Sequence, residues 1–531
     1  MRITNKIIQR NNLSNINTNK IYQDKLSTQM STQKKINRPS DDPVIAIRAL
    51  RLRSNVNEIT QYYSKNIPDA ESWLSVTEAG LKNLSQIMTN MITQCTKGSN
   101  GPLKSSDRQI ILEELRGLGD EVYSTGDADY AGRYVFTGFR TDTPLSFMKE
   151  EKGLKYTITE QLDNTAIDSV TKVKTGNLLD INSSNYNDPA MAGIDEKDVD
   201  SVECYRIRLA YNNCLEDGTN VKIEYTDSSQ NPPVKVTWPG NGVNITTKHS
   251  YEDPYTEAAN DDDAVIYVPE TGELLLGKNR YGELMGTKDQ DSSPENEAEI
   301  RVTYEKSDWL KGDLRPEHYF YCTSQDMNDP QAKPVTYNEN YLDVKAERQV
   351  IEYDVGFNQT IQVNSTADEC FQHNVGREVD DIVNAMQDVL DLESVKAKIE
   401  EIMKSFDTDK EGAANAADIA TLNKQLDAVN KALTYAKEKE QKLFEKGITT
   451  FQKHLDDANL CITDCGTRSR KLSLIKNRME NQKTTFDTLK SDNEDVDITE
   501  VAINLNSAEL TYNAALMATG KVTQSTLINY I

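Results

Sequence analysis

The last 34 residues of the chain, 498–531, carry the apolar pattern that most restricts the fold. Steps of three and four residues alternate there, which is the spacing of a heptad seam on an α-helix. The positions are Ile498, Val501, Leu505, Ala508, Tyr512, Ala515, Thr519, Val522, Thr526 and Asn529. At 1.5 Å per residue, such a helix would be about 50 Å long.

A second apolar row accompanies this seam. It consists of Ile503, Leu510, Met517 and Ile531, and Gln524 interrupts it. A helix with two such rows shows apolar surface over much of its circumference, so one partner helix cannot cover it. Either the helix is buried inside one globule, or copies of the same protein cover it in an assembly. We favour the assembly.

Length and charge restrict the partners that the chain can have. Its 531 residues exceed what one core can hold, which predicts three or more structural regions. The formal net charge of -25 argues against nucleic acid or an anionic membrane as the main partner. Residues 1–53 are an exception, with eleven Lys and Arg against three Asp. A transit peptide or a nucleic-acid arm would also start in this way, but we do not favour either alternative.

The sequence contains no clear targeting signal. The first 30 residues lack the continuous apolar segment of a cleaved secretory signal, and no run reaches transmembrane length. Composition alone would therefore indicate a soluble cytoplasmic protein. Seven dispersed cysteines, an odd number, do not suggest a disulfide framework: Cys95, Cys204, Cys214, Cys322, Cys370, Cys461 and Cys465. The compartment stays open on this evidence.

The amino-terminal part of the chain predicts helices. Residues 3–36 have a weak helical face and would need the carboxyl-terminal helix, or neighbouring subunits, to order them. A capping turn follows, in which an Asp or Ser side chain accepts from free amides and a proline takes the first helical position. That turn consists of Ser40, Asp41, Asp42 and Pro43. The helix after it is expected to reach Tyr63.

A second heptad begins after Pro68 and ends before the Gly-Pro loop at residues 97–102. Its positions are Ala70, Leu74, Thr77, Leu81, Leu84, Met88, Met91 and Cys95. Another helix is expected between Ile111 and Thr125, and the two should pack as an antiparallel pair across the loop.

The middle of the chain changes to β patterns. Alternating apolar residues and turn signals from about residue 145 to residue 365 predict an acidic, mainly antiparallel insertion of one or two small domains. Residues 131–139 predict a short strand or hairpin before it. Helical periodicity resumes at Val379, and a third heptad register runs from Ala458 to Leu489. The acidic stretch 491–497 shifts the phase, which indicates a joint before the terminal helix.

Candidate chemistry is sparse. Residues 407–418 place oxygen-bearing side chains at positions 1, 3, 5, 9 and 12 of an EF-hand loop, with glycine at position 6. Position 12 is Asp rather than Glu and no paired loop is evident, so we favour a polar turn between helices. Cys461, Cys465 and His454 lack the spacing of a zinc site, and their heptad positions indicate a core. We predict no catalytic residue, no cofactor and no metal site.

Four segments at the two ends of the chain carry a family resemblance. They are residues 1–5 (MRITN), 38–43 (RPSDDP), 504–516 (NLNSAELTYNAAL) and 527–531 (LINYI). These segments resemble the flagellin family, and in particular its hook-associated members. Filament flagellins carry a related turn without these prolines and usually end differently. Residues 131–139 and 351–364 resemble the segments by which the family leaves and re-enters its helical core, whereas residues 392–446 look additional.

The resemblance implies an α+β fold, in which both termini build a long α-helical hairpin or coiled-coil bundle and a mainly antiparallel β region is inserted. Three regions are expected. They are a terminal assembly domain (1–42 and 498–531), a helical rod (43–145 and 366–497, including the extra segment near 392–446) and a β-rich surface insertion (146–365).

The resemblance also implies a function. We expect a structural, non-enzymatic subunit of the bacterial flagellum that connects hook to filament and leaves the cell uncleaved through the flagellar export channel. Its site would be an extracellular or periplasmic flagellum. Its partners would be copies of itself in a ring, another hook-associated protein, flagellin and an export chaperone, but neither nucleic acid nor a membrane. The residues expected to pack in the assembly are Leu505, Tyr512, Leu516, Val522 and Leu527.

Two alternatives stay open. The first is a filament flagellin. The second belongs to another class, because the β insertion could display an enzyme or a Ca²⁺-dependent adhesin on the flagellar surface.

Overall fold

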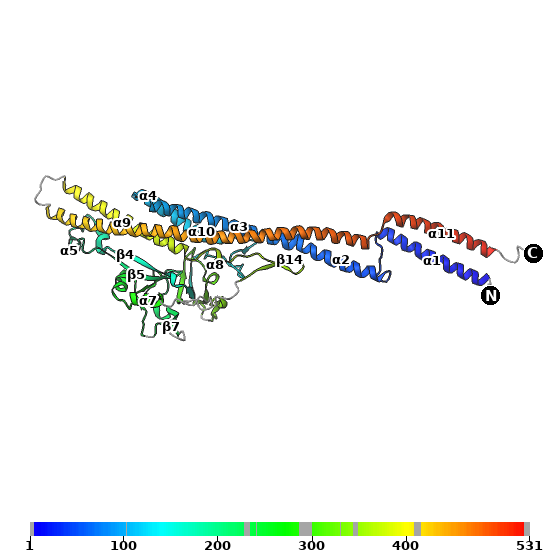
Figure 1. Cartoon of the computed structure of the whole chain (residues 1–531), viewed down its shortest axis with the longest axis horizontal. Coiled ribbons are helices and arrows are strands. Elements are labelled where there is room, and N and C mark those ends of the chain that lie inside the picture. The colour runs from blue at the N-terminus through cyan, green and yellow to red at the C-terminus, as the bar shows by residue number, and fades with distance from the viewer. Residues whose placement is uncertain are drawn as a thin grey trace, which may run out of the picture. The chain divides into compact units, whose positions relative to one another are not determined.

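The computed structural model describes residues 5–101, 103–227, 234–240, 242–285, 300–329, 331–342, 349–407 and 416–524 (Figure 1). The chain divides into two compact units. Unit 1 comprises residues 1–71, 353–361 and 469–531, and unit 2 comprises residues 72–352 and 362–468. The predicted limits at 42/43 and 497/498 fall inside unit 1, and the division into three functional regions stays a prediction.

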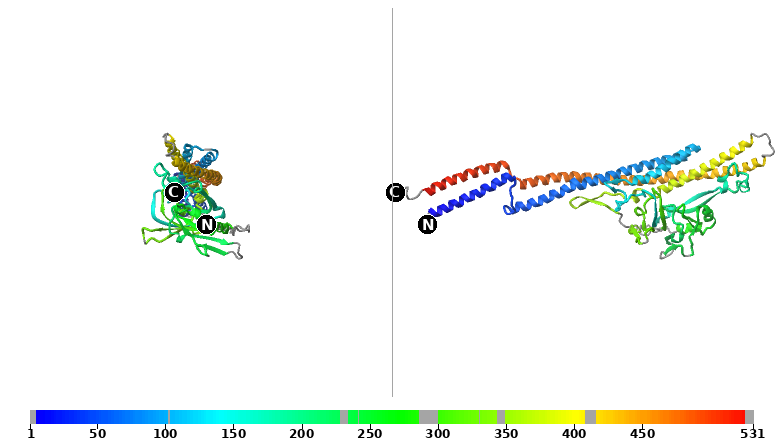
Figure 2. Two further views of the ribbon diagram at one scale, coloured as in Figure 1. Left: turned by 90° about the vertical axis from the view of Figure 1, so that its left-hand side faces the viewer. Right: turned by 180° about the vertical axis from the view of Figure 1, so that it is seen from behind.

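Unit 1 is built from helices and one hairpin. Helices α1 (Asn5–Thr32) and α11 (Ile498–Gln524) lie side by side, as the ribbon views in Figure 2 also show. The unit also holds α2 (Pro43–Gln61), the π-helical turn η1 (Tyr62–Asn66), the start of α3 (Ile67–Ser99) and the last part of α10 (Ala416–Glu494). The hairpin β14 (Glu352–Gly356) and β15 (Gln359–Gln362) returns from the insertion, as the sequence predicts.

The helix start at Pro68 is where the sequence prediction differs from the structure. The sequence predicts a break there, yet α2 continues through η1 into α3, and Pro68 lies in the first turn of α3. Proline lacks an N–H, and in a regular α-helix its ring collides with the carbonyl group four residues earlier. The wider π-turn, closed by Ile67 N–H donating to the Tyr62 carbonyl oxygen, lets the helix pass this position.

Helix α3 confirms the second heptad. Every position of that seam on α3 is buried: Ala70, Leu74, Thr77, Leu81, Leu84, Met88, Met91 and Cys95. We expected α4 (Ser105–Gly126) to pair with α3 across the loop, but the principal helix contact of α4 is with α9 (Val375–Asp407). Gly447 lets α10 lie close to α9 and α3, because a Cβ atom there would lie 2.9 Å from Ile382 Cδ1 and 3.3 Å from Cys95 Sγ.

Two sheets form the β insertion. A six-stranded antiparallel sheet has the order β13-β12-β3-β11-β6-β7. A five-stranded sheet has the order β4-β5-β10-β9-β8, in which only β8 and β9 are parallel. The strands of the first are β3 (Glu151–Leu162), β6 (Lys222–Asp227), β7 (Val234–Trp238), β11 (Ile300–Trp309), β12 (Tyr321–Asp326) and β13 (Val335–Tyr337). The strands of the second are β4 (Ile167–Lys174), β5 (Asp200–Arg208), β8 (Thr246–Thr247), β9 (Val265–Val268) and β10 (Glu273–Leu276).

The predicted α+β fold with a mainly antiparallel insertion is therefore confirmed. Short helices connect the strands, namely α5 (Pro189–Ala192), α6 (Pro254–Asn260), α7 (Lys278–Met285) and α8 (Ala367–Cys370). The strand predicted at residues 131–139 is shorter than expected. Only β1 (Asp129–Tyr130) and β2 (Arg133–Tyr134) pair, because Ala131 and Gly132 turn the chain with positive φ angles of 53° and 76°.

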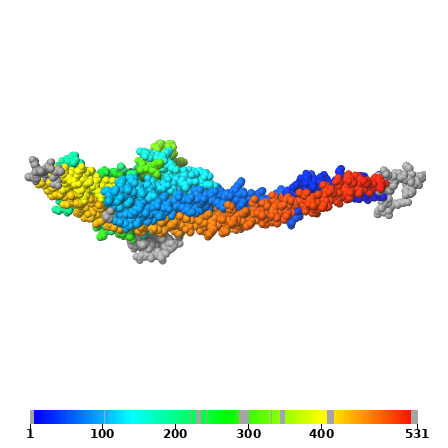
Figure 3. Space-filling view, turned by 90° about the horizontal axis from the view of Figure 1, so that it is seen from above, coloured from blue at the N-terminus to red at the C-terminus, as the bar shows by residue number. Residues whose placement is uncertain are grey.

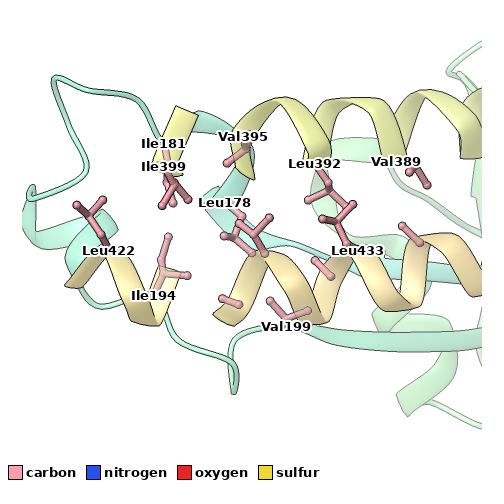
Figure 4. Close-up of a cluster of buried hydrophobic side chains, with 14 residues drawn as sticks. Leu178, Ile181, Ile194, Val199, Val389, Leu392, Val395, Ile399, Leu422 and Leu433 are labelled. Atoms are coloured by element: carbon pink, nitrogen blue, oxygen red, sulfur yellow. The ribbon is translucent and has the colours of Figure 1, made fainter. Parts of the chain in front are cut away.

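The additional helical segment predicted near 392–446 packs against the insertion. Figure 4 shows side chains of α9 and α10 meeting apolar residues of the loops between β4 and β5. Those loops contribute Leu178, Ile181, Ile194 and Val199, whereas the helices contribute Val389, Leu392, Val395, Ile399, Leu422 and Leu433. The extra helical hairpin and the insertion thus share one core in unit 2.

A buried ionic cluster fixes the five-stranded sheet to the same helices. Arg206 on β5, with 3% of its side chain exposed, contacts Asp168 at 2.8 Å, Glu273 at 2.5 Å and Asp381 of α9 at 2.5 Å. Lys446 of α10 reaches Asp168 at 2.6 Å. Burial alone would raise the pKa of Asp381, but the neighbouring guanidinium groups, chiefly that of Arg206, hold it at about 2.

Candidate assembly interface

The two terminal helices meet along a narrow seam. Its apolar centre consists of Leu26 from α1 with Val501 and Ala508 from α11, and the half-buried Leu505 packs against them. The seam positions that the sequence predicts on α11 are thus the ones that face α1 within the same subunit. One helix covers one row, as a heptad pair should.

The α1 side of this seam is largely polar. Its buried and half-buried positions follow one another in steps of three or four residues, and they are Ile8, Asn12, Ile16, Asn19, Gln23, Leu26 and Gln29. Of these side chains only Leu26 is fully buried, at 4% exposure. Little apolar area is therefore removed from water between the two helices, and the pair gains little stability from its own contact.

Apolar residues remain on the outside of both helices. On α11 the second row stays exposed, with Ile503 at 65%, Leu510 at 74% and Met517 at 72%. Figure 3 shows α11 (red) uncovered along its length on the face that it draws. Large exposed side chains on α1 are Ile7, Leu13, Ile21, Tyr22 and Met30. Contiguous apolar rows of this kind on a helix are typical of an interaction surface.

The structure divides the five residues that we expected to pack in the assembly. Leu505 and Tyr512 are half-buried on the seam toward α1, whereas Leu516 is 43% exposed. Val522 lies in the last described turns of α11, and Leu527 lies outside the described residues. The exposed row from Ile503 to Met517 is the better candidate surface, and its exact seven-residue spacing was visible in the sequence.

The capping turn precedes α2. Asp42 is its N-cap, and its Oδ1 accepts from the amides of Val44 at 2.9 Å and Ile45 at 3.2 Å. Asp41 shapes the preceding turn by accepting from the Arg38 amide at 3.0 Å. Pro43 takes the first helical position, and the exposed Ser40 precedes both carboxylates. Of the three capping candidates, Asp42 is thus the one that caps the helix.

The predicted joint at residues 491–497 lies beside the connection between α1 and α2. Lys34 pairs with Asp495 in an isolated antiparallel bridge. Flanking backbone bonds run from the Lys35 amide to the Glu494 carbonyl at 2.8 Å and from the Val496 amide to the Gln33 carbonyl at 3.1 Å. The helical hydrogen bonds of α1 and α10 therefore end beside each other, and hydrogen bonds between residues 33–35 and residues 494–496 follow.

Opposite charges meet at this joint. Arg53 donates two hydrogen bonds of 2.6 Å to the carboxylate of Glu494, a side chain with only 4% exposure. Lys34 contacts Glu494 at 3.6 Å and also pairs with Asp495. The hydrogen bond from Arg53 lowers the pKa of Glu494, and the hydrogen bond from Lys34 lowers the pKa of Asp495. Basic residues of the amino-terminal segment are thus partly neutralised by Glu494 and Asp495 near the carboxyl-terminal end.

The candidate metal sites gain no support. The central residues of the EF-hand-like loop, 408–415, lie outside the described residues. Within the part of the chain that the structure describes, no three His, Cys, Asp or Glu side chains gather in a way that could hold a metal ion. Cys465 is fully buried, and His454 contacts Glu378 at 3.0 Å instead of the cysteines. Among the same described residues, no helix combines the length and apolar character needed to cross a membrane.

Comparison with known proteins confirms the resemblance at the amino-terminal end. Residues 3–141 match the model of the bacterial flagellin N-terminal helical region. This match covers α1 to α4 and extends through the short strands β1 and β2. About the first quarter of the chain is therefore similar to this helical region of flagellins.

Two similar relatives are flagellar hook-associated protein 3 of Escherichia coli, 31% identical over 155 residues, and that of Salmonella typhimurium, 29% identical over 143 residues. These alignments cover 29% and 27% of this chain. They span 48% and 45% of the relatives, so the chain matches about half the length of each. A flagellin of Clostridium tyrobutyricum is 29% identical over 122 residues, which is 23% of this chain and 32% of that protein.

Among solved structures, the flagellar hook-associated protein 3 of Legionella pneumophila is similar at 12% sequence identity with a TM-score of 0.29. That alignment covers 83% of this chain and 97% of the Legionella chain. The resemblance to the flagellin family rests on the sequence matches rather than on this superposition.

Proposed function

We propose that this protein is a structural subunit of the bacterial flagellum that connects the hook to the flagellin filament. The observation that carries the proposal is the sequence match to hook-associated protein 3 from two organisms, together with the match of residues 3–141 to the flagellin N-terminal helical region. The matched relatives are named as flagellar components, which favours a structural role over catalysis.

The terminal helices support assembly as the mechanism. A seam whose α1 side is mainly Asn and Gln holds α1 and α11 together only weakly, and the exposed row on α11 offers an uncovered apolar surface. Burial of each large side chain in that row would contribute about 1.5–3 kcal/mol. Neighbouring subunits that cover the row would therefore supply stability that the isolated pair lacks, and folding would be completed on assembly.

The partners follow from this role. We propose that copies of this chain form a ring, which contacts another hook-associated protein on one side and flagellin on the other. An export chaperone would cover the terminal helices before assembly. The protein would thus belong to an extracellular or periplasmic flagellum.

A filament flagellin is the second candidate, because the match to the Clostridium flagellin is nearly as strong in identity. Copy number separates the two. Quantitative mass spectrometry of purified, depolymerised flagella would compare this chain with the flagellin of the same organism. We expect trace amounts, consistent with one small ring. Thousands of copies per flagellum would make it a filament subunit, and complete absence from intact flagella would overturn both roles.

An enzyme or adhesin displayed by the β insertion is a third candidate, and no feature of the described residues favours it. Binding and hydrolysis assays on the intact protein, with and without Ca²⁺, would test it. Ca²⁺-dependent binding or turnover would establish an additional role for the insertion.

A further inference from the structure

Two of the seven cysteines lie together where the chain returns from the insertion to the rod. Cys370 is the last residue of α8 and is 2% exposed. Cys461 lies half-buried on α10 and donates to the carbonyl oxygen of Glu369 with a sulfur-to-oxygen distance of 3.6 Å. Cys461 also lies close enough to the Cys370 thiol to raise its pKa.

Local structure holds Cys370 in place. At the start of the short helix α8, the Thr366 amide donates to the Glu369 carboxylate at 3.5 Å, and the Glu369 amide donates to the Thr366 carbonyl oxygen at 3.2 Å. The next residue, Phe371, is fully buried and packs edge-on against Phe136 with ring centroids 4.8 Å apart. The Cys370 thiol is therefore presented to α10 by a fixed backbone rather than by a loop that could turn it away.

The other cysteines have different surroundings. Cys95, Cys204, Cys214, Cys322 and Cys465 are all buried, and burial raises the pKa of each thiol, to about 11 for Cys465 and to about 12 for Cys95, Cys204 and Cys214. Cys465 lies one helical turn from Cys461, but Cβ atoms at that spacing are about 5–6 Å apart. A disulfide needs about 3.5–4.5 Å, so a bond within this turn would distort the helix.

We propose that Cys370 and Cys461 are a redox modification site, at which an intramolecular disulfide links α8 to α10. The oxidant is a disulfide, either a small molecule or a protein. The thiolate of Cys461, the more exposed of the two, attacks one sulfur of that disulfide and expels the other as a thiolate. The thiolate of Cys370 then attacks the sulfur of Cys461 and expels the second thiolate. Two protein thiols are oxidised, one external disulfide is reduced to two thiols, and the two protons pass to the expelled thiolates.

The reactivity of the pair has a clear order. The neighbouring Cys461 thiol, followed by burial, raises the pKa of the Cys370 thiol. Cys461 is therefore expected to react first, and the closing attack by Cys370 should accelerate as the pH rises because the thiolate is the nucleophile.

The link would close a large loop. About ninety residues lie between the two cysteines, and they include all of α9. A crosslink across a loop of that length restricts the unfolded chain more than it restricts the folded one. The oxidised protein should therefore unfold at a higher temperature, by about 5 °C or more. This inference does not depend on the proposed flagellar role.

Oxidised glutathione provides the test. The full-length protein is first reduced with a phosphine, then incubated with oxidised glutathione at pH 8 and digested after free thiols have been alkylated. We expect the intact mass to fall by two hydrogen atoms and peptides containing residues 370 and 461 to be crosslinked. A folded protein in which Cys461 stays glutathionylated, or in which both thiols stay free, would overturn the proposal.

Three single variants make the assignment specific. Cys461→Ala should abolish the crosslink and the gain in thermal stability, and because Cys461 is half-buried this variant should retain the helical circular dichroism of the parent. Cys370→Ala should leave Cys461 as a mixed disulfide with glutathione. Cys465→Ala is the matched control on the same helix and should still crosslink. A crosslink that persists in Cys461→Ala, or disappears in folded Cys465→Ala, would show that another pair reacts.

Discussion

Two heptad seams of the chain, one on α3 and one between α1 and α11, differ in how much apolar surface their helices leave exposed. All eight seam positions on α3 are buried within the subunit. The terminal pair buries Leu26, Val501 and Ala508, while Ile503, Leu510 and Met517 stay more than 60% exposed. The rod helix is thus satisfied by its own chain, whereas the terminal pair leaves apolar surface for a partner. Heptad spacing alone tells which residues share a face, but not whether that face is covered within one subunit.

The largest expected loss of stability is at the ionic cluster of unit 2. Arg206→Ala would leave Glu273 without its guanidinium and weaken the pairing of Asp168 and Asp381. We expect about 3–5 kcal/mol of destabilisation, because removal of one partner leaves buried charge uncompensated. Urea unfolding followed by circular dichroism would measure it. The matched change in unit 1 is Lys476→Ala, which removes a partly exposed partner of Glu71 and should cost about 1 kcal/mol or less. Equal losses of stability in the two variants would contradict the expected difference between the buried and the exposed ion pairs.

Truncation of a buried side chain in the α3 seam should cause the next largest loss of stability. Leu81 is completely buried, so Leu81→Ala removes buried methyl groups and leaves a cavity. We expect a loss of about 2–5 kcal/mol and a lower thermal midpoint. Calorimetry of the free subunit would show it. A loss below about 0.5 kcal/mol would mean that the seam is not a core of the isolated chain.

Acid should weaken both regions, but unequally. Asp381 ionises at a pKa of about 2 in the folded protein and near 3.9 in the unfolded chain. Its lowered pKa gives stability that is fully present above pH 4 and is lost as the pH falls through 2, which amounts to about 2–3 kcal/mol. The lowered pKa values of Glu494 and Asp495 act with the same sign at the joint.

Thermal melting between pH 7 and pH 2 would test this contrast. The fall in stability should become shallower in Asp381→Asn, and to a smaller extent in Glu494→Gln. A steeper fall in either variant would reverse the sign of the shift that we infer.

The capping turn should have a moderate effect. Asp42→Ala removes the acceptor for the amides of Val44 and Ile45, which should cost about 1 kcal/mol. Hydrogen exchange of those two amides should become faster. Asp42→Asn keeps a capping oxygen and serves as the control, so equal losses in both variants would assign the effect to charge rather than to the cap.

The smallest effect on the free subunit should come from the exposed row, although its effect on assembly should be large. Leu510 is 74% exposed, so Leu510→Ala should change subunit stability by less than about 0.5 kcal/mol. Under the proposed function, the same change should reduce incorporation into flagella several-fold because a buried contact between subunits is lost. Glu509→Ala, next to it on α11, is the control. Normal incorporation of the leucine variant would remove this row from the interface.

Sequence periodicity predicted the buried face of α3 and a joint at residues 491–497, although α10 continues to Glu494 and the break is confined to residues 495–497. The passage of the helix through Pro68 could not be predicted, since the π-turn that permits it has no residue signature. The contact of Cys461 with Glu369, the residue before Cys370, and the cluster around Arg206 depend on topology that brings distant segments together. Spacing along the chain contains no information about either.

The preference for Leu505 and Tyr512 as assembly residues shows the same limit. Both follow the stronger heptad, but a partner for that heptad exists within the chain. The weaker, interrupted row became the exposed one. Residue pattern identifies the faces of such a helix, and only the fold decides which face an external partner can reach.

The joint has a mechanical consequence. An unbroken helix resists bending through its continuous ladder of backbone hydrogen bonds. The ladder of each segment ends at the level of Lys34 and Asp495, and the resistance beyond it comes from a few cross-chain hydrogen bonds and from the ion pairs of Glu494. Because salt screens such partly exposed pairs, the bending stiffness at this level should depend on ionic strength, whereas the stiffness of the helices on either side should not.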